Sequence, residues 1–414
     1  MIGRNVPHAI LTFRYNTEIF AGLPEVRFEV DGIPVYDPRL DSTVGGNGAQ
    51  RWTTRATWAV SNNPMVLIYN ILRGIELPGL GIWGGQFEAA DLPLAAWFAA
   101  MNECDVAVAL AAGGTEPAFR AGLEVRVDQT PAEAIETLLA ACNGQLADIG
   151  GVWKPRVGGP SLPVLFFDDD DIVISRAQEF RPFPALDARH NAIAATYPEP
   201  AARWEPKDAP PIYIATWEAE DGGRRLERAL TLSAVPYALQ VQRLMRAAIA
   251  ESRRFYHHSL VLPPDTAILE PLDAVAWTSA RHQYTAKSFE AGEVSDDQQR
   301  LLQAVALREK DNSDHIWLPA NEQPFSVPSR AVLAPPAQTV PGWAVAGVTL
   351  SDTASNARRA ALELLWTGSD QDDVRGLQWE VRLAGTMAVI LRGSFQEVAS
   401  GRIVVADGII PGLP

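Results

Sequence analysis

Residues 58–74 read WAVSNNPMVLIYNILRG, and this stretch predicts the helix around which the first part of the chain folds. Asn63 can cap a helix, Pro64 suits the first helical position and Gly74 suits the end. Apolar residues recur at helical spacing, and they would form the buried face: Met65, Ile68, Tyr69 and Leu72. The stretch therefore predicts an amphipathic helix with defined ends.

Helix signals recur in three other segments, 91–103, 130–144 and 234–257. Asp91 would cap the first of these helices. Thr130 and Glu133 would open the second with a capping box. Cys142 falls on the buried face of that helix, so a core thiol is a better interpretation than a disulfide with Cys104 or a nucleophile.

Short runs typical of β-strands fill much of the remaining sequence. The Asp31–Gly32 pair lies between two such runs and predicts a hairpin turn. Residues 41–51 are glycine-rich and polar, which favours a loop over a phosphate cradle because no Lys-Ser/Thr follows. The other runs expected to be strands are 152–157, 162–167, 172–175, 190–197, 257–262, 267–272 and 273–279.

The last third of the chain opens with the proline-rich segment LAPPAQTVPGW and continues in alternating runs separated by turn signals. This pattern predicts a small β-sandwich-like, fibronectin III-like domain. The fold class expected for the whole chain is α+β, β-rich and multidomain. The expected domains are 1–115 with short strands and two helices, 116–190 as a small α+β domain, 191–334 with the helix 234–257, and 335–414 as the sandwich-like unit.

Composition and charge narrow the function classes. The 414 residues carry a net charge of −15 and scattered Lys and Arg, so the basic stripe of a nucleic-acid binder is missing. An acidic surface would repel passing DNA. No apolar run reaches the roughly 20 residues of a membrane span, and the first residues lack the pattern of a signal peptide. We therefore expect a soluble protein made in the cytoplasm.

The run of four aspartates, Asp168, Asp169, Asp170 and Asp171, allows three interpretations: a metal site, a catalytic acid cluster or a turn. A calcium loop spaces its acids and includes a glycine, which this run does not. Neighbouring side chains on a strand point to opposite faces, so at most two of the four could converge. A charged hairpin turn between 162–167 and 172–175 is the favoured interpretation, and the four residues remain weak candidates for an acidic site.

Other catalytic and metal motifs are missing from the sequence. It contains no HExxH, GxSxG, CxxC or complete P-loop. His257 and His258 are adjacent, so on a helix they would diverge by about 100° and could not share one metal. We expect them at a helix end. The sequence therefore predicts a protein that is not an enzyme and that has no catalytic residue, no metal site and no cofactor.

Several motifs in order resemble the J-like central tail-tip proteins of long-tailed bacteriophages and gene transfer agents. The first is EVRFEVDGIPVYDPR, with Asp37, Pro38 and Arg39, and the second is the 58–74 helix, with Trp58, Asn63 and Pro64. Asn70 stands where that family usually has aspartate. Two later matches are the strand with Asn191 and Tyr197, and the Pro271-Leu272-Asp273 turn, where the family's glycine is missing.

The resemblance covers roughly residues 9–330 and implies a structural virion protein with phage tail hub domains. Such proteins form a homotrimer at the distal end of the tail tube, pack against the distal tail protein, contact the tape-measure protein and support tail fibres or a spike. They close the channel until DNA passes, without binding it specifically. The resemblance places the protein in the virion, at the tail tip, after assembly in the host cytoplasm.

Two alternatives stay open at this stage. One is a carbohydrate-binding host-attachment module that contacts a host surface glycan through the last domain. The other is a tail-associated hydrolase of cell wall or capsule, with Asp168–Asp171 as its candidate acids. Family members are often much longer, so we expect either neighbouring polypeptides to supply the missing parts or the chain to be a section of a longer hub protein.

Overall fold

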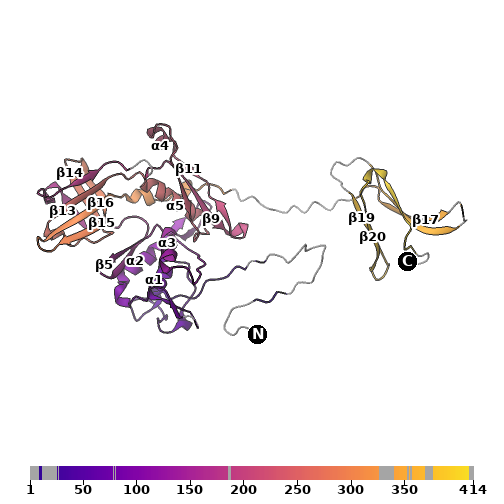
Figure 1. Ribbon diagram of the computed structural model, residues 1–414, viewed down its shortest axis with the longest axis horizontal. Coiled ribbons are helices and arrows are strands. Elements are labelled where there is room, and N and C mark those ends of the chain that lie inside the picture. The colour runs from indigo at the N-terminus through magenta and orange to yellow at the C-terminus, as the bar shows by residue number, and fades with distance from the viewer. Residues whose placement is uncertain are drawn as a thin grey trace. The chain divides into compact units, whose positions relative to one another are not determined.

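The computed structural model describes residues 9–11, 26, 28–77, 79, 81–184, 188–325, 340–351, 354, 357–368 and 376–409. The chain divides into two compact units, Met1–Val327 and Pro328–Pro414. Both units are rich in strands arranged in several small sheets, with few helices, which confirms the α+β class (Figure 1).

The helices of the first unit begin and end where local signals allow. Their bounds are α1 Pro64–Arg73, α2 Leu94–Cys104, α3 Pro131–Ala140, α4 Ala215–Glu220 and α5 Ala238–Glu251. The side chain of Asn63 accepts hydrogen bonds at the start of α1, and Gly74 ends it with φ 93°. Thr130 caps α3 through Glu133 N–H. The predicted ends of α1 and the Thr130 cap of α3 are confirmed, whereas α3 ends at Ala140, before the predicted end at 144.

Two predicted helices have different ends. Asp91 does not cap α2, because its carboxylate accepts from Glu88 N–H in a preceding 3-10 turn, and Pro93 precedes the helix instead. The helix predicted over 234–257 is shorter at both ends. Pro236 disfavours a helical residue before it, so α5 begins only at Ala238.

Most strands of the first unit are short. They are β1 Ile75–Leu77, β2 Gly81–Trp83, β3 Ala107–Ala109, β4 Thr115–Pro117, β5 Gln145–Ile149, β6 Val152–Arg156, β7 Leu165–Asp168, β8 Glu179–Arg181, β9 Ala192–Glu199, β10 Glu205–Asp208, β11 Ile212–Tyr213, β12 Glu227–Thr231, β13 His257–Leu262, β14 Ala274–Ser279, β15 Tyr284–Asp297 and β16 Leu302–Glu309. The main sheet has the order β7-β14-β15-β16-β13-β8, and a four-stranded sheet gathers around β9.

Three predicted strand features are wrong. Residues 28–34 form no strand, so the Asp31–Gly32 hairpin is absent from the described residues. An isolated hairpin without further packing is only marginally stable. Residues 172–175 form a bend followed by a turn, and Val173 N–H donates to Val261 O of β13 at 3.0 Å, so this segment contacts β13 and forms no hairpin with β7. Residues 267–272 form turns after the Pro263–Pro264 pair, which opens a 3-10 turn.

Two hydrophobic cores hold the first unit together. The larger core joins α1, α2, α3 and α5 to the β9 sheet, with Trp97, Met65, Ile68, Ile193 and Met245 fully buried (Figure 1). The second lies on the main sheet around Phe289, Trp277 and Leu307. Cys104 and Cys142 are free thiols inside the larger core, as expected for core cysteines. Burial raises the pKa of the Cys142 thiol, which keeps it protonated.

The second unit is a small all-β body with its own core. Its strands are β17 Ala344–Ser351, β18 Arg358–Leu365, β19 Leu377–Arg382, β20 Val389–Phe395 and β21 Arg402–Val405. They form a three-stranded sheet, β17-β18-β21, and a two-stranded sheet, β19-β20, around Leu364, Trp366 and Val405. The predicted proline-rich linker lies largely outside the described residues.

Candidate functional site

Two stretches of the family motif meet at the carboxyl end of α2. The guanidinium of Arg39 donates hydrogen bonds to both carboxylate oxygens of Asp37, from Nε to Oδ1 at 3.1 Å and from Nη2 to Oδ2 at 2.7 Å. The third guanidinium nitrogen, Nη1, donates to Asp105 Oδ2 at 2.7 Å and Asn102 Oδ1 at 2.9 Å. Asn63 Nδ2 donates to the other oxygen of Asp105 at 3.0 Å. Asp105 thus connects the Asp37–Arg39 turn to the start of α1.

The other motif residues in this region have structural roles as well. Pro38 and Pro64 each occupy the first position of a helical turn and are buried. Trp58 donates its indole N–H to Arg51 O at 2.9 Å and packs against Trp52, with ring centroids 5.3 Å apart. None of these contacts leaves a polar group directed at an open site.

Asn70 is a buried residue of α1, and its side-chain amide forms hydrogen bonds with the backbone of Tyr36 and of Val66. Its Oδ1 accepts from Tyr36 N–H at 3.0 Å, while Nδ2 donates to Tyr36 O at 2.7 Å and Val66 O at 2.8 Å. An ionised aspartate could accept the first bond but could not donate the other two. An asparagine at this position therefore matches the two carbonyl oxygens and the N–H group around it.

Asn191 and Tyr197 hold the β9 sheet to its surroundings. Asn191 accepts from Leu226 N–H and donates to Arg224 O and Asp221 Oδ2, each at 2.8 Å. The Tyr197 hydroxyl donates to Glu199. Burial and that carboxylate raise the pKa of Tyr197 above its usual range. Both residues are nearly fully buried, so neither is available to a ligand.

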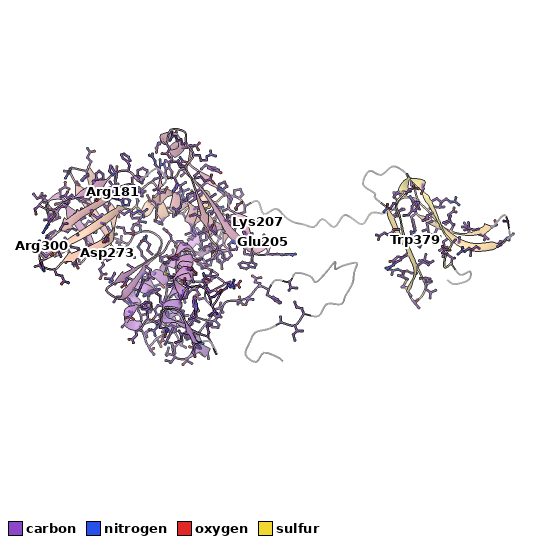
Figure 2. The ribbon with its side chains drawn as sticks, viewed as in Figure 1. Arg181, Glu205, Lys207, Asp273, Arg300 and Trp379 are labelled. Atoms are coloured by element: carbon purple, nitrogen blue, oxygen red, sulfur yellow. The ribbon has the colours of Figure 1, made fainter. Side chains whose placement is uncertain are left out.

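In the Pro271-Leu272-Asp273 turn, Leu272 adopts a left-handed backbone conformation of the kind that glycine favours. Leu272 has φ 75°, and Asp273 N–H donates to Glu270 O at 3.2 Å across the turn. Proline followed by a residue with positive φ is the pattern of a type II turn. The carboxylate of Asp273, whose position Figure 2 labels, accepts from Glu270 N–H at 2.9 Å. Leucine therefore occupies a backbone position that normally belongs to glycine.

The four aspartates form a 3-10 turn at the end of β7, not a hairpin turn. Asp168 precedes the turn, and its carboxylate accepts from Asp170 N–H at 2.9 Å, while the Asp171 carboxylate accepts from Asp168 N–H at 2.9 Å. Asp169 faces the 279–281 turn: burial acts to raise its pKa, but the Ser279 hydroxyl and Arg281 N–H outweigh that effect and lower the pKa. The side chains do not converge, and no metal-binding group of three or more His, Cys, Asp or Glu occurs among the described residues.

His257 and His258 lie on β13 and not at a helix end, because the chain enters the main sheet right after α5. On the strand they point to opposite faces, so His257 is exposed and His258 is buried. His258 stacks on Phe180 at 4.4 Å between ring centroids, and its Nε2 lies 3.1 Å from the Tyr284 hydroxyl. Burial, followed by the nearby charge of His282, lowers the pKa of His258 to about 4. The ring is therefore neutral at pH 7.

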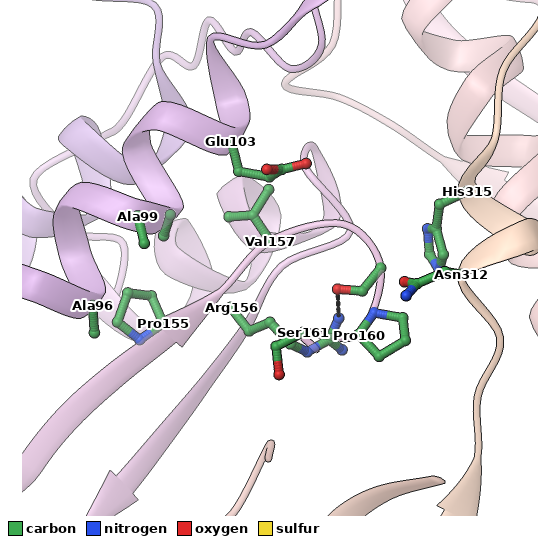
Figure 3. Close-up of a pocket in the computed structure, with 12 residues that line it drawn as sticks. Ala96, Ala99, Glu103, Pro155, Arg156, Val157, Pro160, Ser161, Asn312 and His315 are labelled. Carbon is green, nitrogen blue, oxygen red and sulfur yellow. Dashed lines mark hydrogen bonds between the residues drawn. The ribbon is translucent and has the colours of Figure 1, made fainter. Parts of the chain in front are cut away.

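A groove with a volume of about 380 Å³ separates α2 from the 155–161 loop and the 312–315 turn (Figure 3). Three alanines of α2 line one side. Of its polar side chains, Arg156 donates to Gly158 O and Gly159 O and forms an ion pair with Glu290 at 2.9 Å. His315 Nε2 lies 3.1 Å from Glu251. Arg156 and His315 thus each lie against a carboxylate inside the protein. The other polar residues that line the groove are Glu103, Ser161 and Asn312.

Sequence reasoning missed the residues that join distant segments through α5. Gln240 accepts from Arg120 N–H at 2.9 Å and donates to Arg120 O and Ala141 O at 2.8 Å. At the end of α5, Glu251 lies 3.1 Å from the buried Lys310 ammonium. Burial acts to raise the pKa of Glu251, but His315 and Lys310 lower it far below its usual range. Polar residues within an apolar helix face are the sequence signal that could have revealed Gln240.

Residues 130–288 match the model of a family described as a putative phage tail protein. This match supports a phage tail protein. It covers less than half of the chain and lies mainly in the α3, β9 and main-sheet region. No curated protein sequence matches the chain.

Two solved structures show a distant likeness to this chain. One is a chain of a structure titled "Virion of native gene transfer agent (GTA) particle", with 17% identity and a TM-score of 0.38 over 46% of this chain and 41% of that one. The other is prophage tail protein gp18 from Listeria monocytogenes EGD-e, with 11% identity and a TM-score of 0.28 over 49% of this chain and 58% of that one. TM-scores below 0.5 do not establish a shared fold. The matched regions cover 41% of the first protein and 58% of the second, so the chain spans less than two thirds of either.

No helix in the described part of the chain is long and apolar enough to cross a membrane.

Proposed function

We propose that this phage tail protein is a structural hub at the tail tip. In this role it forms a homotrimer at the distal end of the tail tube, packs against the distal tail protein and the end of the tape-measure protein, and carries tail fibres or a spike. It closes the channel until DNA is delivered. The match of residues 130–288 to a phage tail protein family is the observation that carries the proposal.

The geometry of the motif residues supports a structural role. Asn63, Asn70 and Asn191 bind backbone groups of other segments, and Arg39 is held between Asp37 and Asp105. Buried polar networks of this kind specify one rigid arrangement of the chain. A protein that transmits force between a tail tube and its fibres requires such rigidity more than it requires an open catalytic cleft.

The charge of the chain supports passage of DNA without binding. A net charge of −15 offers no release of counterions from phosphate, which is the main source of non-specific DNA affinity. We propose that the protein is not an enzyme and requires no cofactor. It would be assembled in the host cytoplasm and incorporated into the virion.

Light scattering after size exclusion, with and without the distal tail protein of the same particle, tests this proposal. We expect three times the chain mass of 45.0 kDa at low protein concentration, and one complex when the distal tail protein is added. A monomer that never binds the distal tail protein would overturn the hub role. Release of sugars from purified cell wall or capsule, lost in an Asp169→Asn, Asp170→Asn double variant, would instead favour a hydrolase.

A further inference from the structure

Strand β17 is an unprotected edge of the second unit. It lies at one end of the β17-β18-β21 sheet, and among the described residues no strand pairs with its outer edge. Eight consecutive residue pairs join it to β18 without a bulge. Its residues are exposed on both faces except Val348, which is half-buried. A long, regular strand with a free edge is a template for pairing with another strand.

The sequence of β17 lacks the features that usually prevent such pairing. Natural edge strands carry charges, proline or bulges that block edge-to-edge association. Residues 344–351 read AVAGVTLS, with no charge and no proline. Each of the other four strands of this unit contains at least one arginine. Strands β19, β20 and β21 also have an edge without a partner among the described residues, but each carries an arginine. β17 is therefore the edge strand that lacks a charge, and two copies of it would meet without electrostatic repulsion.

We infer that β17 pairs with β17 of a second copy of this chain, antiparallel and about a two-fold axis. When the axis is perpendicular to the sheet, one residue of β17 must face its own copy across the axis, because opposite residues of antiparallel strands have side chains on the same face. Centring the axis on Val348 places Ala346 opposite Leu350 of the second copy, and Val348 opposite itself. Centring it on Gly347 would place two glycines opposite each other, which contributes no side-chain contact.

The Val348-centred pair forms a continuous apolar row. Ala346, Val348 and Leu350 lie on one face of β17, so the two copies contribute six apolar side chains with small residues opposite large ones. The opposite face pairs Gly347 with Thr349 of the second copy. The two sheets then join into one six-stranded sheet in which both copies of β17 are central strands.

Gly347→Lys tests the pairing without disturbing the unit. A Cβ at Gly347 meets nothing within 4 Å, so a lysine fits the isolated strand. In the paired state the two lysines lie near each other and near the axis, which opposes association. The matched control is Gly122→Lys, because Gly122 in the first unit also has open space around its Cβ.

We expect the wild-type mass to double between low and high protein concentration in sedimentation velocity. Gly122→Lys should show the same doubling, and Gly347→Lys should need about tenfold more protein or fail to double. If the basic state is the trimer proposed above, it carries three copies of β17, so its mass should rise at least twofold, and the two variants are compared in the same way. No doubling in the wild type, or equal doubling in Gly347→Lys, would overturn the inference.

A cysteine at the axis tests the register. Val348→Cys places two thiols opposite each other, so a short bismaleimide should join two chains. Ala346→Cys places the thiols about 14 Å apart, four residues out of register, and should give little product. The native cysteines Cys104 and Cys142 are fully buried and give no background in the folded protein. Equal cross-linking of both variants, or none with Val348→Cys, would contradict the Val348-centred pair.

Discussion

The side-chain amide of Asn70 and the backbone of Tyr36 form two hydrogen bonds in opposite directions, at 3.0 and 2.7 Å. This pair fixes the segment that leads into the Asp37–Arg39 turn against the middle of α1. Because both groups are buried, water cannot replace either bond if one partner changes. Asn70 therefore connects the two motif stretches from inside the core, while Asp105 connects them at the surface.

Asn70→Asp should destabilise the protein by about 2–3 kcal/mol at pH 7, because the carboxylate would face two carbonyl oxygens in a buried site. Part of the loss should be recovered as the pH falls from 7 to 5, since a buried carboxyl with a raised pKa becomes protonated and can donate one bond. Urea unfolding of both proteins at each pH measures the difference. A constant difference across this range would contradict the assigned contacts.

Leu272→Gly should give a more stable protein than Leu272→Ala, by about 1 kcal/mol. Both variants remove the leucine side chain, but only glycine relieves the cost of a left-handed φ at this position. This order is the reverse of the ordinary ranking, in which alanine is favoured over glycine. Thermal unfolding of the two variants measures the difference, and a more stable alanine variant would rule out the positive φ.

His258 should make the stability depend on pH in the acid range. Its pKa is lowered to about 4 in the folded protein, against about 6.5 when unfolded, so its contribution is complete above pH 6.5 and is lost as the pH falls towards 4. The loss should reach about 3 kcal/mol. His258→Phe keeps an aromatic ring beside Phe180, so this variant should lose less stability over the same interval. If the free energy of unfolding fell equally with pH in the wild type and in His258→Phe, the pKa of His258 would not be lowered in the folded protein.

The four aspartates should differ in their effect on folding. Asp169→Ala should cost about 1 kcal/mol because it removes the acceptor for Ser279 and Arg281. Asp170→Ala should change the stability by less than about 0.5 kcal/mol, since that side chain is exposed. Chemical unfolding of the two variants side by side distinguishes them. Equal and large losses would indicate a shared role for the cluster, such as a bound ion.

Local signals in the sequence determined several elements almost completely. Asn63-Pro64 and Gly74 set both ends of α1, and Thr130-Pro131 set the start of α3, because capping groups and fixed backbone angles act within one turn of the chain. The strand with Asn191 and Tyr197 and the strand-rich second unit were also predictable from alternating apolar residues. These features depend on neighbours in the sequence.

Only the tertiary structure decided which segments meet. β7 pairs in parallel with the distant strand β14, and the four aspartates lie in a capped 3-10 turn and not in a hairpin turn. Entry into the main sheet ended α5 early and moved His258 into an aromatic cluster. Tyr36 lies 34 residues from Asn70, Arg120 lies 120 residues from Gln240, and Lys310 and His315 lie 59 and 64 residues from Glu251. Contacts over such separations depend on the packing of the whole unit, which no local pattern encodes.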